Sequence, residues 1–147
     1  MIERALILAV IAGLVLAVVA LTRTWSAHRV ADLRTRGHER LWSALGETPD
    51  GRPSLVVFST PSCTPCRTVQ HPAVQAVAAR FGSVLRVVRV DLARRPAVGK
   101  AFNVMTAPTT VVLAGDGRVG SVNHGFAPAD QLFSQISALG VAPASPR

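Results

Sequence analysis

Two cysteines, Cys63 and Cys66, are the only cysteines of the 147-residue chain, and they enclose the dipeptide Thr64-Pro65. Cys63 lies where an apolar run ends and a helical pattern begins, so backbone N–H groups and the helix dipole favour a thiolate there. Cys66 follows one helical turn later, so its sulfur can reach that of Cys63. Such a pair can cycle between dithiol and disulfide through a mixed disulfide. The spacing predicts a redox-active dithiol with Cys63 as nucleophile and Cys66 as resolving cysteine.

The same cysteines are poor candidates for a metal site. A structural zinc site needs about four ligands, usually two such pairs or one pair with two spaced histidines. The four histidines are scattered along the chain: His28, His38, His71 and His124. The sequence therefore predicts no metal and no other cofactor. An accidental pair of buried cysteines is the alternative, and the strand–Cys-x-Pro-Cys–helix context argues against it.

Patterns of secondary structure surround the pair. Ser54 to Ser59 is a continuous apolar run, typical of a strand buried on both faces. Thr64 to Arg80 has apolar residues close to helical spacing, and Pro72 predicts a kink within it. Val84 to Asp91 predicts a second strand, and Arg94 to Phe102 a short helix with proline in its first turn.

The second half of the chain continues with strands. Within Val104 to Leu113, Pro108 is predicted to stand at the start of a β-branched strand, because proline has no N–H to donate to a sheet. Gly115-Asp116-Gly117 is typical of a hairpin turn, and a return strand follows it. Pro128 to Leu139 predicts a final helix. The order β-α-β-α-β-β-α predicts an α/β fold, with two parallel crossovers before an antiparallel hairpin and helices around a central mixed sheet.

An uncharged and almost wholly apolar segment runs from Ala5 to Thr22. As a helix it would span about 27 Å, close to the ~30 Å hydrocarbon core of a bilayer. Arg4 and Arg23 flank it, and Trp25 suits a membrane interface. We expect residues 5–22 to be an uncleaved anchor in the lipid bilayer. A cleaved signal peptide is the alternative.

The basic residues predict the orientation of this anchor. The formal net charge is +8, but the arginines are dispersed and aromatic residues are few, which argues against binding to nucleic acid. More basic residues follow the apolar segment than precede it. The positive-inside rule therefore predicts a single-pass protein of the cell membrane with its carboxy-terminal domain in the cytoplasm. The opposite topology, with an extracytoplasmic domain, stays open.

These patterns divide the chain into four parts. Residues 1–22 are the predicted transmembrane anchor, 23–40 a basic juxtamembrane spacer, 41–140 the folded domain and 141–147 a disordered tail. At the start of the domain, Leu41, Trp42 and Leu45 predict a short helix that packs onto it.

From about Leu41 to Leu139 the chain resembles the thioredoxin family. The resemblance is carried by four features: Cys63-Thr64-Pro65-Cys66, Ala107-Pro108-Thr109 downstream, the Gly115–Gly117 hairpin, and Gly125 before the last helix. It implies a thioredoxin-like fold in which the Ala107–Pro108 peptide bond is cis and Pro108 faces the dithiol. It also implies that the backbone of Ala107 pairs with a bound substrate chain. Pro65, which keeps the turn between the cysteines rigid, completes the predicted substrate-binding set.

Several positions depart from the family pattern. Val57 and Val87 stand where thioredoxins carry a buried aspartate and its lysine partner. Ser62 stands in place of the tryptophan before the first cysteine, and Pro72 is one residue later than the family's kink proline. Without the buried acid, deprotonation of Cys66 must use water or the substrate. We therefore expect slower resolution of the mixed disulfide, or a narrower set of partners.

Two side chains near the dithiol are candidates for tuning its ionisation. Arg67 follows the pair where the family usually has a basic residue; it could favour the thiolate, or it could be a solvated arginine. His71 is a candidate base, but it lies about one and a half turns past Cys66 in a regular helix. A surface histidine is therefore the favoured interpretation of His71.

The predicted function is that of a membrane-tethered thiol-disulfide oxidoreductase, an enzyme acting as a reductase on protein or small-molecule disulfides. Its electrons would be exchanged with an unidentified redox partner, with membrane proteins among the candidates. Two alternatives stay open. One is an exported reductase of the kind that serves cytochrome c maturation, although the glutamate-bearing insertions typical of that group are absent. The other is a non-catalytic thioredoxin-like module that binds a partner or senses redox state.

Overall fold

The computed structural model describes residues 13–18 and 38–144. The chain divides into two units, Met1–Asp32 and Leu33–Arg147, which are considered separately. Residues 13–18 of the first unit are helical, with exposed side chains. Apart from these, the predicted anchor over residues 5–22 lies outside the described residues, as does most of the predicted spacer. In the two described stretches, no helix is both long enough and apolar enough to cross a membrane.

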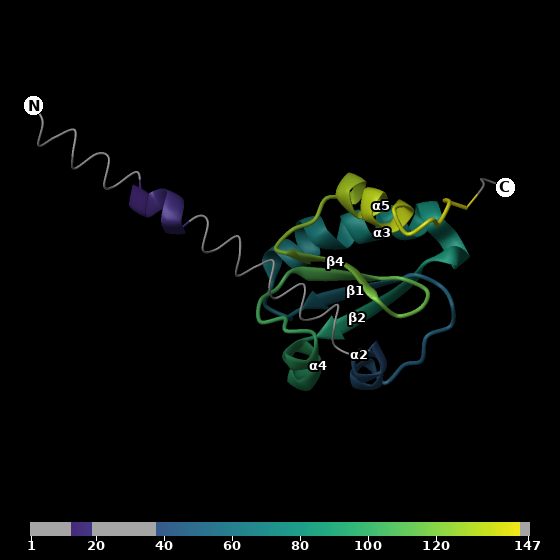
Figure 1. Cartoon of the computed structure of the whole chain (residues 1–147), viewed down its shortest axis with the longest axis horizontal. Helices are drawn as coiled ribbons and strands as arrows, with labels where there is room; N and C mark the ends of the chain where they lie inside the picture. The colour runs from purple at the N-terminus through teal and green to yellow at the C-terminus, as the bar shows by residue number, and fades with distance from the viewer. Residues whose placement is uncertain (1–12, 19–37, 145–147) are drawn as a thin grey trace, which may run out of the picture. The chain divides into compact units, whose positions relative to one another are not determined.

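The second unit is a four-stranded sheet with helices on both of its faces (Figure 1). The elements follow the predicted order, preceded by one helix. They are α2 (His38–Leu45), β1 (Ser54–Ser59), η1 (Cys66–Gln70), α3 (His71–Phe81), η2 (Gly82–Val84), β2 (Arg86–Asp91), α4 (Pro96–Ala101), β3 (Thr109–Leu113), β4 (Val119–His124) and α5 (Ala129–Ser137). Here η1 is a π-helical turn and η2 a 3-10 turn.

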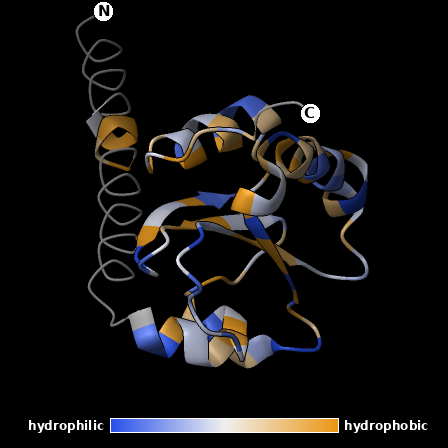
Figure 2. Ribbon diagram, turned by 90° about the vertical axis from the view of Figure 1, so that its right-hand side faces the viewer, coloured by the Kyte–Doolittle hydropathy of each residue, from blue (hydrophilic) through white to orange (hydrophobic). Residues whose placement is uncertain are grey.

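Strand β1 lies at the centre of the domain. The strand order is β2-β1-β3-β4, and successive residues of a strand point to opposite faces. Val56 and Phe58 join the core under α2 and α4, whereas Leu55 and Val57 join the core under α3 and α5. Figure 2 shows these two helical layers with the sheet between them. Burial on both faces explains why β1 is a continuous apolar run with the predicted bounds.

One predicted feature of the topology is wrong. Strands β1 and β2 are parallel, but β3 is antiparallel to β1, so of the two crossovers only the first joins parallel strands within the described sheet. Packing after α4 gives the physical reason. Phe102, which directly follows α4, packs on Phe58 near the end of β1. The chain therefore re-enters the sheet at that end, where Thr109 pairs with Phe58. The predicted mixed sheet is confirmed.

The hairpin between β3 and β4 turns at Gly115-Asp116-Gly117, as predicted. Gly117 has a φ of 86°, a conformation that glycine adopts without steric cost. At Gly115, an added Cβ atom would overlap the carbonyl oxygen of Gly51. The turn therefore packs directly against the backbone that leads into β1.

The predicted short helix before the domain is confirmed as α2. Its residues Leu41, Trp42 and Leu45 are buried and belong to the same core as Phe58. Phe58 in turn packs on Phe102 with a ring-centroid distance of 5.4 Å. A fragment that retains this core must therefore begin no later than α2.

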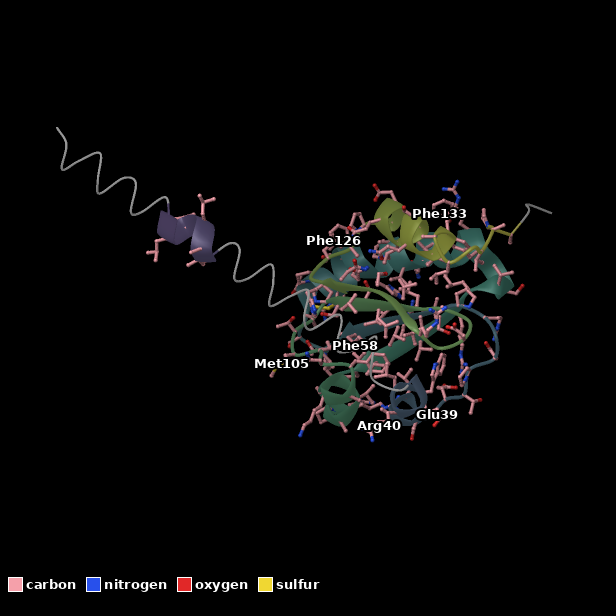
Figure 3. The ribbon with its side chains drawn as sticks, in the orientation of Figure 1. Glu39, Arg40, Phe58, Met105, Phe126 and Phe133 are labelled. Atoms are coloured by element: carbon pink, nitrogen blue, oxygen red, sulfur yellow. A yellow bond between two sulfur atoms is a disulfide. The ribbon has the colours of Figure 1, made fainter. Side chains whose placement is uncertain are left out.

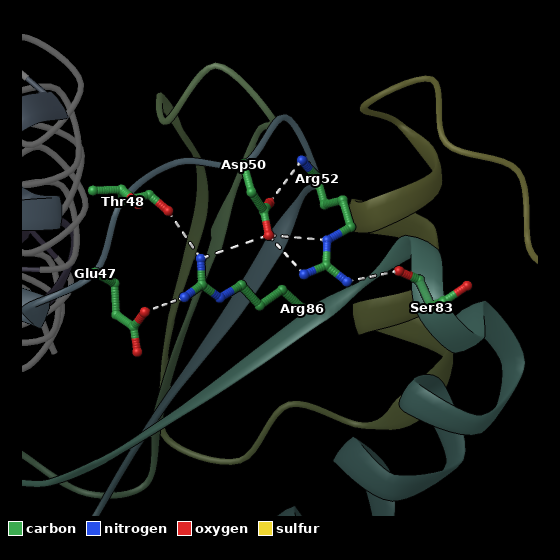
Figure 4. A network of polar contacts seen from close by, with 6 residues as sticks. All are labelled: Glu47, Thr48, Asp50, Arg52, Ser83 and Arg86. Carbon is green, nitrogen blue, oxygen red and sulfur yellow. Dashed lines mark hydrogen bonds and ion pairs between the residues drawn. The ribbon is translucent and has the colours of Figure 1, made fainter.

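A polar network joins the segment after α2 to the start of β2 (Figure 4). Arg86 donates a hydrogen bond to the carboxylate of Glu47 and lies 3.8 Å from the carboxylate of Asp50. The same Asp50 carboxylate accepts a 2.6 Å hydrogen bond from Arg52. The Arg86 guanidinium also lies 5.6 Å from the ring centroid of Trp42. This network connects α2, the entry segment and the sheet.

The chain beyond α5 also packs against the domain. The backbone N–H of Ala144 donates to the carbonyl oxygen of Arg80 at 3.1 Å, and Val141 packs against the core under α3 and α5. The segment predicted to be disordered, residues 141–147, therefore begins with residues that contact the domain. Residues 145–147 lie outside the described part of the chain.

Candidate functional site: a disulfide at the end of the central strand

Cys63 and Cys66 form a disulfide, with their Cα atoms 5.3 Å apart. β1 ends at Ser59, and a tight turn leads from it to the first cysteine. The backbone N–H of Cys63 donates to the carbonyl oxygen of Thr60 at 3.1 Å and closes this turn. Both cysteines are largely buried. The central strand of the sheet therefore holds the dithiol at its carboxyl end.

Hydrogen bonding distinguishes the two sulfurs, although burial does not. The backbone N–H of Cys66 donates to Sγ of Cys63 at 3.1 Å. A donor aimed at a sulfur stabilises its thiolate form, and the adjacent helix start adds the positive end of the helix dipole. Among the described residues, no corresponding donor reaches Sγ of Cys66. The geometry therefore favours Cys63 over Cys66 as the thiolate of the reduced protein.

Arg67 is held across the loop that precedes the dithiol. Its Nη1 donates to the carbonyl oxygen of Pro61 at 3.3 Å, and the side chain is exposed. Pro65, between the cysteines, is also exposed and has helical dihedral angles. Arg67 therefore braces the loop and leaves its charge close to the dithiol.

The helix after the dithiol differs from the predicted single helix with a kink at Pro72. Residues Cys66–Gln70 form the π-helical turn η1, in which the backbone N–H of His71 donates to the carbonyl oxygen of Cys66. α3 begins at His71, with Pro72 in its first turn. A π-turn holds one residue more than an α-turn between its hydrogen-bonded groups. The π-turn therefore accommodates the additional residue by which Pro72 follows the usual position of the kink proline in thioredoxins.

Pro108 lies at the same end of the sheet as the dithiol. Phe58, near the end of β1, pairs with Thr109 at the start of β3, so Pro108 adjoins the end of β1. The Ala107–Pro108 peptide bond is cis, as the resemblance to thioredoxins implied. The Pro108 carbonyl oxygen accepts a 2.8 Å hydrogen bond from the backbone N–H of Gly125. Pairing of the strands thus brings together three segments that are far apart in sequence.

A cleft of about 300 Å³ opens beside Cys66. One side comes from the carboxyl ends of the two parallel strands, where Val57 and Ser59 of β1 are register partners of Arg89 and Asp91 of β2. The other side comes from the dithiol loop and the helix that follows: Thr60, Pro61, Cys66, Arg67, His71 and Val74. The carboxyl ends of parallel strands are a common position for ligand sites in α/β proteins.

Sequence reasoning did not assign the two charged cleft residues of β2, Arg89 and Asp91, to the site. A signal was available, because residues two apart share a face of a strand. Arg86 is three residues from Arg89 and so belongs to the opposite face. Val57 forms part of the cleft wall, so the position at which thioredoxins carry an acid is apolar and adjoins Cys66.

Gln70 is a second residue that the sequence analysis missed. Its side chain is buried and pairs with the backbone of Ala127 in both directions. Nε2 donates to the Ala127 carbonyl oxygen at 3.1 Å, and Oε1 accepts from the Ala127 N–H at 2.9 Å. Because Gln70 ends the π-turn, this pair ties the dithiol helix to the loop between β4 and α5. A lone glutamine in an apolar helical pattern carries no sequence signal for such a long-range bond.

Large apolar side chains are exposed at this end of the domain. Met105, in the loop before Pro108, is 80% exposed, and Phe126, after β4, is 49% exposed. Figure 3 shows both side chains at the same end of the domain. Exposed apolar residues next to a reactive group are typical of surfaces that contact a partner.

Comparison with known proteins agrees with this architecture. Residues 45–138 match the family model described as Thioredoxin. The thioredoxin of Porphyra purpurea is 32% identical over 85 residues, which cover 58% of this chain and 78% of that protein. The thioredoxin of Bacillus subtilis (strain 168) is 31% identical over 95 residues, covering 65% and 88%. A solved structure of a mutant thioredoxin from Halobacterium salinarum superposes with a TM-score of 0.56 at 26% identity, covering 67% of this chain and 81% of that one.

The chain belongs to the thioredoxin family. Its fold, its homologues and its Cys63–Cys66 disulfide identify it as a thiol-disulfide oxidoreductase. Thioredoxin-like proteins act on protein disulfides, and these findings favour the enzyme over the non-catalytic module considered above.

Proposed function

We propose that this oxidoreductase reduces protein disulfides while tethered to the cell membrane by residues 5–22. The observation that carries the proposed chemistry is the 3.1 Å hydrogen bond from the Cys66 N–H to Sγ of Cys63. It selects Cys63 as the thiolate that attacks, because only the charged form gains from that donor.

The reaction begins from the reduced dithiol. The Cys63 thiolate attacks one sulfur of the substrate disulfide, forms a mixed disulfide and releases the other substrate sulfur as a thiolate. Cys66 then loses its proton and attacks Sγ of Cys63. This second attack forms the Cys63–Cys66 disulfide and releases the remaining substrate sulfur. Two electrons pass from the protein to the substrate, and a separate redox partner returns them.

The substrate chain is held at the segment before β3. The backbone of Ala107 supplies hydrogen bonds to an extended substrate, Pro108 sets the shape of the surface beside the dithiol, and Pro65 presents the dithiol turn to solvent. Ala107 is half-buried and Pro65 exposed, so both are accessible to a partner. The apolar side chains of Met105 and Phe126 extend this surface.

The tether and its orientation rest on the amino-acid sequence. Residues 5–22 are uncharged, and basic residues are concentrated after them. The positive-inside rule then places the domain in the cytoplasm, a reducing compartment suited to a reductase. An exported domain would face an oxidising compartment, where a membrane-tethered reductase could serve cytochrome c maturation.

The catalytic proposal is tested with the full-length protein and insulin as a disulfide substrate, with dithiothreitol as electron donor. We expect Cys63→Ser to reduce the rate to that of dithiothreitol alone. Cys66→Ser, reduced beforehand and mixed with insulin after dithiothreitol has been removed, is expected to accumulate a covalent complex with the substrate. Ser62→Ala changes the exposed neighbouring residue and is expected to keep the wild-type rate. A Cys63→Ser variant as active as wild type would contradict the proposal.

Topology is tested separately with reporters fused after Arg147. An alkaline phosphatase fusion that is inactive, together with a fluorescent protein fusion that is bright, is the result expected for a cytoplasmic domain. The reverse pattern would overturn the cytoplasmic assignment and favour the exported reductase. Extraction of the protein from membranes by carbonate, without detergent, would argue against the anchor.

A further inference from the structure

We propose that the cleft beside Cys66 is the route by which the resolving cysteine loses its proton, and that His71 accepts that proton. The inference rests on the proposed function, because it takes Cys66 as the cysteine that resolves the mixed disulfide. In this proposal His71 takes over the proton-accepting role of the buried aspartate of thioredoxins, whose position is occupied here by Val57.

Cys66 and His71 line the same cleft. Cys66 is largely buried, whereas His71, Arg67 and Pro61 at the mouth of the cleft are exposed. A volume of about 300 Å³ can hold several water molecules. Water in the cleft can therefore connect the buried sulfur to the imidazole and to solvent.

The π-turn brings His71 into this position. In an α-helix, residues five apart differ by about 140° around the axis, so His71 would point away from Cys66. In η1 the backbone N–H of His71 instead bonds to the carbonyl oxygen of Cys66, so the two residues lie one wider turn apart, one above the other. His71 is exposed, as expected for a surface histidine, and it also lines the cleft beside Cys66.

The other ionisable groups that face the cleft are less suited to this role. Arg67 from the dithiol helix and Arg89 from β2 are permanently protonated donors and cannot accept a proton. Asp91 is already engaged, because its carboxylate accepts from the Ala93 N–H at 2.9 Å and lies 3.7 Å from Nε of Arg94.

The imidazole of His71, by contrast, has no hydrogen bond or ion pair with another residue in the described part of the chain.

The step balances without a further reactant. In the mixed disulfide, the Cys66 thiol gives its proton through cleft water to the imidazole of His71. The Cys66 thiolate attacks Sγ of Cys63, forming one S–S bond and breaking the bond to the substrate sulfur. The substrate leaves as a thiolate, which takes a proton from solvent, and the imidazolium releases its proton to solvent.

The test follows the two attacks separately in the reduced full-length protein mixed with dithiodipyridine, a neutral disulfide whose thione product absorbs light. The first phase reports attack by Cys63, and the second reports attack by Cys66. We expect His71→Gln to leave the first phase unchanged and to slow the second by about a hundredfold at neutral pH, as for loss of a positioned base. His71→Glu keeps a side chain that can accept a proton at this position, so it should retain more of the second phase than His71→Gln does.

Matched controls separate this role from others. Gln75→His added to His71→Gln moves the imidazole one α-turn along the exposed side of α3, and should not restore the second phase. Asp91→Asn should slow it much less than His71→Gln does. The inference is overturned if His71→Gln keeps a wild-type second phase, or if Asp91→Asn removes it instead. Failure of the proposed function looks different, since wild-type protein would then lack a second phase that Cys66→Ser could abolish.

Discussion

Strand β2 carries two arginines, Arg86 and Arg89, whose surroundings differ. Arg86, at the start of the strand, faces the core under α2 and α4. It bonds to Glu47 and to the Thr48 carbonyl oxygen at 2.9 Å, near Asp50. Arg89, three residues later, faces the cleft beside Cys66 and is exposed. Among the described residues its side chain has no ion pair or hydrogen bond.

The difference separates a structural end of the sheet from a reactive end. At the first end, opposite charges neutralise one another and connect segments that are distant in sequence. At the second, cations and a histidine surround a redox sulfur with no acid at Val57 to balance them. A cation without an ion-pair partner can stabilise a nearby thiolate or attract a negatively charged substrate. A cation held in ion pairs contributes to the stability of the fold instead.

The largest expected effect comes from placing a charge at the reactive end with Val57→Asp. Val57 is 8% exposed, so the free energy of unfolding should fall by about 2–3 kcal/mol at neutral pH. Burial raises the pKa of the introduced carboxyl above its ordinary value of about 3.9. The charge-dependent part of the loss should therefore appear as the pH rises and be absent in acid. Denaturant unfolding at several pH values measures this.

Val57→Asn is the matched control, because it introduces a polar group of similar size without the charge. Its loss of stability should not depend on pH. If the aspartate also takes over proton transfer, His71→Gln should cost little in the Val57→Asp background. A full loss of the second phase in that double variant would show that the carboxyl does not serve Cys66.

The second-largest effect concerns the hydrogen bonds between Gln70 and the loop that joins β4 to α5. Gln70→Ala leaves the buried N–H and carbonyl oxygen of Ala127 without their partner, so unfolding free energy should fall by about 2 kcal/mol. Gln75→Ala, on the exposed side of α3, should stay within about 0.5 kcal/mol of wild type. Chemical denaturation compares the two. Equal stability of the two variants would mean that water replaces the glutamine at no cost.

The arginine pair itself supplies the third prediction. Arg86→Gln should lower the unfolding free energy by about 1 kcal/mol, because it removes ion pairs and the contact with Trp42. It should leave the two phases of the dithiol reaction unchanged. Arg89→Gln should leave stability within about 0.5 kcal/mol and slow the reaction with negatively charged disulfides, an effect that salt removes. A loss of stability in Arg89→Gln together with an altered reaction rate in Arg86→Gln would refute the division into structural and reactive ends.

The smallest effect is the pH dependence of the paired end. Hydrogen bonds from Arg52 are the main cause that lowers the pKa of Asp50, and the charge of Arg86 adds to it. A carboxyl whose pKa is lowered by folding stabilises the folded state above its unfolded pKa, and this contribution is lost as the pH falls through the folded value. Asp50→Asn should therefore be slightly less stable than wild type at neutral pH and equal to it in strong acid. A difference that persists in acid would point to lost packing instead.

Local pattern predicted much of the domain. The apolar run of β1, the hairpin glycines, α2 and the dithiol could be found because each depends on residues close together in sequence. The cis bond at Pro108 followed from resemblance to a family. The direction of β3 could not be found in this way, because it depends on which end of the sheet the chain meets after α4, and that is set by packing of Phe102 on Phe58.

The amino-acid sequence by itself determined that a Cys63–Cys66 dithiol follows a buried strand, and that no acid stands at Val57. Only the tertiary structure decided what surrounds that dithiol. The π-turn and the cleft place His71 beside Cys66, and strand register places Arg89 and Asp91 in the same cleft. Gln70 bonds to Ala127, which lies 57 residues away in sequence. The physical reason is that hydrophobic periodicity depends on residues close together in sequence. Helical type, strand direction and long-range polar pairing depend instead on how distant segments pack against one another.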